Sequence, residues 1–137
     1  MDLNAKLADI VASCRADSGT IHMMHGDGVL HLEAATANIP AFVLDKVQLV
    51  PVGKGMAGLA VERNEPVTAC NIQTDTTGDV RSGAKATGLQ GAIALPIRNP
   101  QGQAVGCLGV ANFAERTFTE EEIAQLLAAG GELVTGR

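Results

Sequence analysis

The fold of this chain is indicated by one glycine-rich stretch, Gly53-Lys54-Gly55-Met56-Ala57-Gly58-Leu59-Ala60-Val61-Glu62-Arg63-Asn64-Glu65-Pro66-Val67. It follows an alternating run at residues 47–52, which predicts a strand. Gly53 and Gly55 allow a sharp turn because glycine reaches positive φ without steric cost. A short helix is predicted at residues 56–63, since Asn64 favours a left-handed stop and Pro66 prevents continuation. The pattern is therefore strand, glycine turn, short helix, strand, with helix-start amides pointing into any cavity above the turn.

The same stretch contains the spacing Gly53-x-Gly55-x-x-Gly58, which is that of the dinucleotide-binding fingerprint, and Asp75 follows at about the expected distance. That fingerprint requires a βαβ unit whose helix is long enough to cross a parallel sheet. Here the predicted helix ends after about two turns. Asp75 lies in a loop rich in Thr, Asp and Gly rather than at a strand end. We therefore expect no nicotinamide cofactor, and no other cofactor is indicated.

The length of 137 residues suits one domain, residues 1–137, with one core. Apolar residues make up 46% and aromatic residues only 2%, so the core must consist of Leu, Val, Ile, Ala and Met. A net charge of −5 without a Lys/Arg cluster argues against nucleic acid or anionic membrane as a partner. The N-terminal residues lack a signal-peptide pattern, and three widely spaced cysteines form no disulfide framework. A reduced, cytoplasmic protein is expected.

Two β-hairpins are predicted. Residues 20–25 and 29–35 flank Gly26-Asp27-Gly28, a strong turn signal. Residues 90–97 and 104–113 flank a second turn that contains proline and glycine. The strands of the second hairpin are nearly continuous apolar runs, so they should be central in the sheet.

The register of the first hairpin decides which residue His22 faces. If Gly26-Asp27 is a two-residue turn, His22 faces His31, close enough to share a metal ion. If Asp27-Gly28 is the turn, His22 faces Glu33 instead. Metal sites usually need three or four ligands, and no third ligand is fixed nearby. Ordinary sheet histidines are favoured, and no metal site is predicted.

Helices are predicted at both ends of the chain. The first spans residues 2–15, and the last begins at Thr119, whose capping box with Glu122 is supported by a hydrophobic staple between Phe118 and Ile123. Gly130-Gly131 is expected to end or kink this last helix. The apolar stripes of the two helices either pack on the sheet or form a homodimer seam, and the residues of that seam would be Leu3, Leu7, Ile10, Ile123 and Leu127.

These segments, in this order and spacing, resemble the GAF family of sensory domains over nearly the whole chain. The matching features are residues 52–58, 64–67, 90–97, 105–110 and 118–122. The resemblance implies an α+β domain of the three-layer, PAS/profilin-like type. Such a domain has a central antiparallel sheet of about six strands, with the N- and C-terminal helices on one face and the cover of a small-ligand pocket on the other.

The pocket is expected between the sheet and a cover formed by residues 56–61 and 71–88. Residues 71–88 form a polar loop, a class of segment that often carries function. Family members commonly have Asp where this chain has Asn71, and an Asp-Pro-Arg-like step where it has Asp79-Val80-Arg81. Asp79 and Arg81 could equally be a solvated pair of little energetic weight. Small residues on the adjoining strand leave volume for a ligand, and the predicted ligand-binding residues are Gly55, Met56, Asn71, Asp79, Arg81, Ala92 and Asn112.

The resemblance also bears on which ligand is bound. Family members that bind cyclic nucleotides carry an Asn-Lys…Phe…Asp-Glu pattern, which Asn112 and Phe118 match. Phe113 stands where Lys would be, and Glu122-Ile123 where Asp-Glu would be, so cyclic nucleotides are disfavoured. No cysteine with aromatic packing indicates a bilin. A small metabolite, either apolar or weakly polar, is the expected partner, and an effector domain or protein is a further possible one. The sequence identifies neither of them.

The favoured function is a non-catalytic, dimeric sensory module that signals through its terminal helices. The catalytic alternative is a free methionine sulfoxide reductase, which in this family uses cysteines in the loop before the penultimate strand. Residues 79–88 contain no cysteine. Cys14 and Cys107 are expected to be structural, and Cys70 could lie near the pocket. A third alternative is a dimerisation domain without a ligand.

Overall fold

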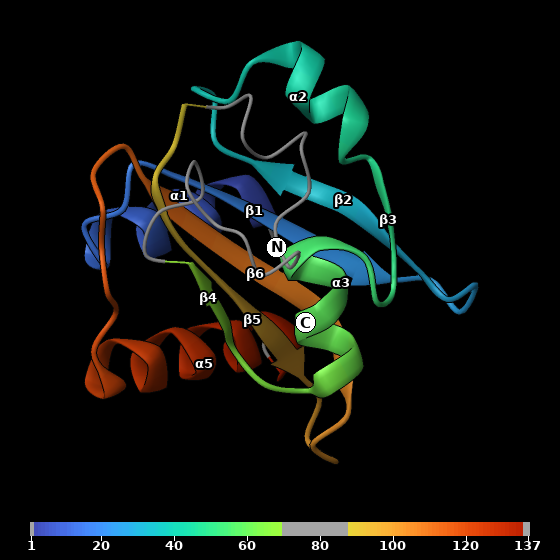
Figure 1. Cartoon of the computed structure of the whole chain (residues 1–137). Helices are drawn as coiled ribbons and strands as arrows, with labels where there is room; N and C mark the ends of the chain where they lie inside the picture. The colour runs from blue at the N-terminus through green and yellow to red at the C-terminus, as the bar shows by residue number, and fades with distance from the viewer. Residues whose placement is uncertain (1, 70–87, 136–137) are drawn as a thin grey trace.

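The central feature of the molecule is one antiparallel sheet with the strand order β3-β2-β1-β6-β5-β4 (Figure 1). A computed structural model describes residues 2–69 and 88–135 of the chain. Within these residues the strands are β1 (Ser18–Met24), β2 (Val29–Ala35), β3 (Leu49–Pro51), β4 (Val67–Ala69), β5 (Gly91–Arg98) and β6 (Ala104–Asn112). The two hairpins, β1–β2 and β5–β6, supply the four inner strands. The predicted six-stranded antiparallel sheet and its central hairpins are confirmed.

The helices divide between the two faces of the sheet. They are α1 (Leu3–Ser13), α2 (Ala41–Lys46), α3 (Gly55–Arg63) and α5 (Glu120–Thr135). The two terminal helices, α1 and α5, pack on one face, while α3 crosses the other face (Figure 1). The short helix α2 lies above β2 in this view, at the side of the sheet that ends with β3. This arrangement confirms the three-layer α+β architecture that the resemblance implied.

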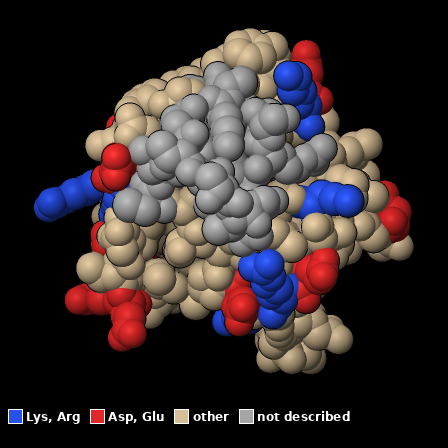
Figure 2. Space-filling model, in the orientation of Figure 1, with Lys and Arg blue, Asp and Glu red and all other residues tan. Residues whose placement is uncertain are grey.

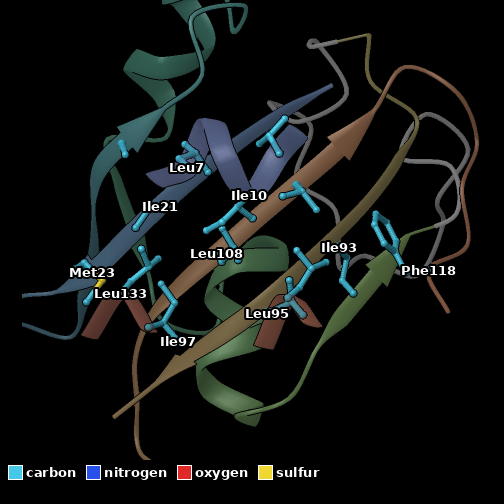
Figure 3. Packing of buried hydrophobic residues seen from close by; sticks show 14 residues of the cluster. Leu7, Ile10, Ile21, Met23, Ile93, Leu95, Ile97, Leu108, Phe118 and Leu133 are labelled. Carbon is cyan, nitrogen blue, oxygen red and sulfur yellow. The ribbon is translucent and has the colours of Figure 1, made fainter. Parts of the chain in front are cut away.

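The larger of the hydrophobic clusters fills the face covered by α1 and α5. On β5, the alternating residues Ile93, Leu95 and Ile97 are almost completely buried there. They lie with side chains of α1 and α5 such as Leu7 and Leu133 (Figure 3). Aliphatic side chains dominate this cluster, as the scarcity of aromatic residues predicts.

The opposite face of the central strands is built from small side chains. Because successive residues of a strand alternate between faces, this face receives Ala92 and Ala94 from β5 and Cys107, Gly109 and Ala111 from β6. Small side chains fill less of the layer between sheet and cover than the Leu and Ile residues on the helix face do. This asymmetry leaves space on the face that carries the small side chains.

The register of the first hairpin differs from both predicted alternatives. His22 pairs with Leu32, and Met23 pairs with His31. The loop is therefore one residue longer than a two-residue turn. Farther along, Ile21 pairs with Ala34, so Glu33 is an extra residue that forms a bulge. Because Met23 belongs to the cluster under α1 and α5, its partner His31 lies on the face opposite His22, and the two histidines cannot share a metal ion. Within residues 2–69 and 88–135 no three metal-ligating side chains come together.

The last helix begins as the sequence predicts. The Thr119 hydroxyl accepts from the Glu122 amide at 3.1 Å, and the Glu122 carboxylate accepts from the Thr119 amide at 2.9 Å. This reciprocal pair lowers the pKa of Glu122, together with the hydrogen bond from Arg116. The helix does not end at Gly130-Gly131, one of the two expected outcomes, because α5 continues to Thr135. A Cβ on Gly130 would lie 3.4 Å from the side chain of Ile97, which is an ordinary van der Waals contact.

Candidate ligand-binding site

A cavity of about 440 Å³ lies on the small-residue face of the sheet. Its floor is formed by side chains of the inner strands, and its walls come from α2, the segment that follows it, and the start of α3. The floor includes Thr20, His22, Ala92, Ala94, Gly109 and Ala111, and the apolar walls include Val43, Val47, Val50, Met56, Ala57 and Leu89. This size and composition fall within the range of small-molecule sites, which are mostly apolar with a few polar groups.

Figure 2 shows the face of the molecule on which α2 and α3 lie. The Lys and Arg side chains visible there are separated from one another, and several stand beside Asp or Glu. The described part of this face therefore presents no basic patch of the kind that binds nucleic acid.

The wall at the start of α3 is shaped by the glycine turn. Gly53 has φ +91°, a conformation that side-chain-bearing residues rarely adopt, and its amide donates to the Gly58 carbonyl at 2.9 Å. A Cβ on Gly58 would stand only 2.5 Å from the carbonyl oxygen of Pro51. The glycines at both ends of the fingerprint-like spacing are thus required by local packing. They need no dinucleotide to explain them, and the helix that follows is short and covers an antiparallel sheet.

The amino end of α3 faces the cavity. Residues 54–57, which are the N-cap and first turn of this helix, all line the cavity. The side chain of the N-cap residue Lys54 makes no capping hydrogen bond. The first amides of a helix carry a partial positive charge, so this wall favours a negatively charged or hydrogen-bond-accepting group.

A column of polar side chains crosses the floor along β1. Ser18, Thr20 and His22 occupy alternate positions of this strand and all line the cavity. Sequence analysis did not assign them to the pocket. The available signal was their spacing of two, which places them on one face of a strand whose intervening residues are apolar or glycine.

His22 is the most unusual of these residues. It is only 3% exposed, and its Nε2 lies 2.8 Å from the carbonyl oxygen of Val47. A carbonyl only accepts, so Nε2 carries the proton and Nδ1 is the unprotonated acceptor. Burial lowers the pKa of His22, which keeps the ring neutral, and this effect exceeds the opposing one of the Val47 carbonyl. Nδ1 is buried and has no hydrogen-bond partner among residues 2–69 and 88–135.

Three of the predicted ligand-binding residues, Gly55, Met56 and Ala92, line the cavity. Three others, Asn71, Asp79 and Arg81, fall outside the described residues. Likewise, the loop of residues 71–88 that was predicted to cover the pocket is described only at its last residue.

Asn112 is not among the cavity-lining residues. Its amide donates to the Arg15 carbonyl at 2.9 Å, and its Oδ1 accepts from Arg116 at 2.9 Å. Arg116 in turn binds Glu122 and lies over the Phe118 ring, 4.2 Å from its centroid. The side chain of Asn112 therefore joins the end of α1 to the segment before α5 instead of facing a ligand.

Several cavity residues outside the floor were not indicated by the sequence, and Lys46, Lys54 and Phe113 are among them. Lys46 ends α2 and Lys54 precedes α3, and both line the cavity while remaining exposed. Phe113, directly after β6, also lines it and is 52% exposed. None of the described lining residues is acidic.

The side chains of the predicted dimer seam pack largely against the core of the same chain. Leu7 is completely buried and Ile10 is 9% exposed, because both lie in the cluster between the sheet and the terminal helices. Leu3, Ile123 and Leu127 pack against the same cluster but are only partly buried. Leu7 thus belongs to the core of the chain itself.

The two described cysteines lack the properties of reactive thiols. Burial raises the pKa of Cys107 to about 12 and also raises the pKa of Cys14 above its ordinary value. Neither thiol is therefore a thiolate at neutral pH. Cys70 lies outside the described residues.

An antiparallel sheet with terminal helices on one face and a cavity on the other defines a three-layer α+β domain of the PAS-like class. The chain belongs to the GAF domain family, whose model matches residues 2–134. No curated protein sequence matches the chain significantly. Among the described residues, no helix combines the length and apolar character needed to cross a membrane.

Solved structures similar to this chain come from proteins of different kinds. The GAF domain of a phosphoenolpyruvate-protein phosphotransferase from Acinetobacter matches with a TM-score of 0.76 and 16% identity, covering 97% of this chain and 77% of that one. A domain described as part of a two-component sensor histidine kinase protein from Sinorhizobium meliloti 1021 gives 0.76 and 16%, covering 98% and 87%. The free methionine-R-sulfoxide reductase from Neisseria meningitidis, solved with its substrate, gives 0.77 and 16%, covering 97% and 74%. At such identities the likeness establishes the fold alone.

Proposed function

We propose that this chain is a non-catalytic GAF domain that binds a small molecule and serves in sensing or regulation. The observation that supports the proposal best is the cavity on the small-residue face of the sheet. It combines a mostly apolar lining with a few convergent polar groups, the usual composition of a small-molecule site. A purely structural domain would gain stability by filling this layer with larger side chains.

Within this proposal Met56 forms an adaptable apolar wall, Gly55 offers its backbone, and Ala92 leaves room on the floor. Asn71, Asp79 and Arg81 remain predicted ligand contacts.

Ala92→Leu tests the assignment of the cavity as a ligand-binding site, because it fills volume without adding charge. A molecule that co-purifies with the wild type and raises its melting temperature should be lost from this variant. Ala128→Leu, on the exposed side of α5, is the matched control and should retain the molecule. Equal retention in both variants would contradict the assignment.

The non-catalytic part of the proposal is supported by the thiols. A sulfoxide reductase needs one thiolate to attack and a second thiol to resolve the intermediate. The raised pKa values of Cys14 and Cys107 oppose both roles. We expect no turnover of free methionine sulfoxide with dithiothreitol as reductant. Thiol-dependent turnover that Cys70→Ser abolishes would instead establish the catalytic alternative.

A homodimer formed through the terminal helices is also part of the proposal, with a narrower seam than the sequence indicated. Leu3, Ile123 and Leu127 are the candidates that retain exposed apolar surface. Leu127→Glu should give monomers in sedimentation velocity, with Ala124→Glu on the exposed side of α5 as the control. Circular dichroism must show that both variants fold. A wild-type protein that sediments as a monomer at high concentration would exclude the dimer.

A further inference from the structure

The buried Nδ1 of His22 has no hydrogen-bond partner in the part of the chain that the structure describes. Leaving a buried polar atom without a hydrogen bond destabilises a protein, so such an atom in a native structure requires an explanation. The ring cannot satisfy Nδ1 by exchanging tautomers, because Nε2 must keep its proton to donate to Val47. A group with an N–H or O–H bond, placed in the cavity that His22 lines, would satisfy it.

The charge of the cavity is a second, independent observation. The described lining contains Lys46 and Lys54 but no Asp or Glu, and no ion pair joins either lysine to a described residue. The uncapped amino end of α3 adds its amides to the same wall. These groups together favour an anion over a neutral or cationic ligand.

We propose that the ligand is a small organic acid that carries a hydrogen-bond donor apart from its carboxylate. The donor, a hydroxyl or amino group, binds Nδ1 of His22, and the carboxylate lies toward the start of α3 and its N-cap residue Lys54. The apolar body packs against Val47, Val50 and Met56. This inference rests on the proposed function, since it specifies the ligand of the same cavity.

A matched series of probes tests separately whether the ligand needs a hydrogen-bond donor and whether it needs a negative charge. Hexanoate carries the charge and the aliphatic body but no donor. 2-Hydroxyhexanoate and 6-hydroxyhexanoate add a donor at a short and a long distance from the carboxylate, and the corresponding hydroxyhexanamides retain the donor without the charge. Titration calorimetry should show that at least one hydroxy acid binds tenfold or more tightly than hexanoate. The same hydroxy acid should also bind tenfold or more tightly than its amide.

Substitutions then assign each requirement to its residue. His22→Leu should abolish the advantage of the hydroxy acid over hexanoate, while His31→Leu, on the opposite face, should retain it. Lys54→Gln should reduce the advantage of the acid over its amide, while Lys6→Gln on α1 should not. If His22→Leu fails to fold, the wild-type protein with ¹⁵N-labelled histidine provides the readout. The Nδ1 resonance of His22 should shift when the hydroxy acid is added and stay unchanged with hexanoate.

Three results would overturn the inference: equal binding of hexanoate and the hydroxy acids, equal or tighter binding of the amides, or no binding by any probe. Native mass spectrometry of the freshly purified protein distinguishes this failure from failure of the proposed function. A co-purified molecule that is neutral or lacks a donor would contradict only the ligand chemistry. The absence of both probe binding and a co-purified molecule would contradict the proposed function as well.

Discussion

The Nε2 of His22 on β1 lies 2.8 Å from the carbonyl oxygen of Val47, the residue that directly follows α2. This hydrogen bond ties an inner strand of the sheet to the segment that forms one wall of the cavity. It also fixes the tautomer of the ring and leaves Nδ1 as an acceptor. One contact thus contributes to both the shape of the site and its chemistry.

The first prediction concerns the pH dependence of stability. Because burial lowers the pKa of His22 below its ordinary value of 6.5, the folded protein binds fewer protons than the unfolded chain below that pH. The contribution of this residue to the free energy of unfolding is therefore complete above pH 6.5. It decreases as acidification brings the pH down toward the pKa of the folded state. Urea unfolding at about pH 7.5 and about pH 5.5 measures the difference.

His22→Gln removes this titrating group, so the variant should lose less stability than the wild type between the two pH values. Gln125→Ala, a substitution of a non-titrating residue at an exposed position of α5, is the control, and its pH dependence should remain close to that of the wild type. If His22→Gln and the wild type lose equal stability on acidification, His22 is not the buried neutral group described above.

The second prediction compares two glycines. A Cβ on Gly106 of β6 would lie 2.5 Å from the carbonyl oxygen of His22, where little adjustment is possible. Gly106→Ala should therefore lower the free energy of unfolding by about 1–3 kcal/mol. A Cβ on Gly131 of α5 would meet nothing within 4 Å. Gly131→Ala should instead raise stability by about 0.5–1 kcal/mol, because alanine favours the helix. Denaturant titration gives the free energy of unfolding of both variants. If Gly106→Ala leaves this free energy unchanged, the described pairing of β1 with β6 is contradicted.

The third prediction concerns the start of α5. Thr119→Ala removes the hydroxyl that accepts from the Glu122 amide, and it should cost about 1 kcal/mol. The measurement is the shift of the urea midpoint relative to Gln125→Ala, an exposed position in the same helix. Equal effects of the two substitutions would mean that the capping box contributes nothing.

The fold was predictable because several local signals agreed. The turn residues at 26–28 and after Arg98 identified both hairpins, and the apolar runs of β5 and β6 placed them in the centre of the sheet. Asn64 ends α3 in the left-handed conformation, with φ +52°, as the sequence indicated. The exact register of the first hairpin was not predictable. A bulge at Glu33 depends on how β2 packs, and no local residue preference encodes it.

The site was predictable only where small residues or the glycine turn signalled it, as at Gly55, Met56 and Ala92. From the sequence, His22 was considered as a metal ligand or an ordinary sheet histidine. A single sequence does not reveal that Nε2 is hydrogen-bonded to the Val47 carbonyl, while Nδ1 has no partner among the described residues. Leu7 was assigned to a dimer seam for a related reason. Its helical spacing indicates an apolar face, but the spacing does not say whether that face meets the sheet or another chain.

The central claim is that the cavity holds a small molecule, and native mass spectrometry of freshly purified protein tests it most directly. We predict a species heavier than the polypeptide by the mass of one small organic molecule per chain, which disappears on denaturation and is absent from Ala92→Leu. A spectrum that contains only the mass of the bare polypeptide or its oligomers, in wild type and variant alike, would contradict the claim and favour a structural or dimerisation domain.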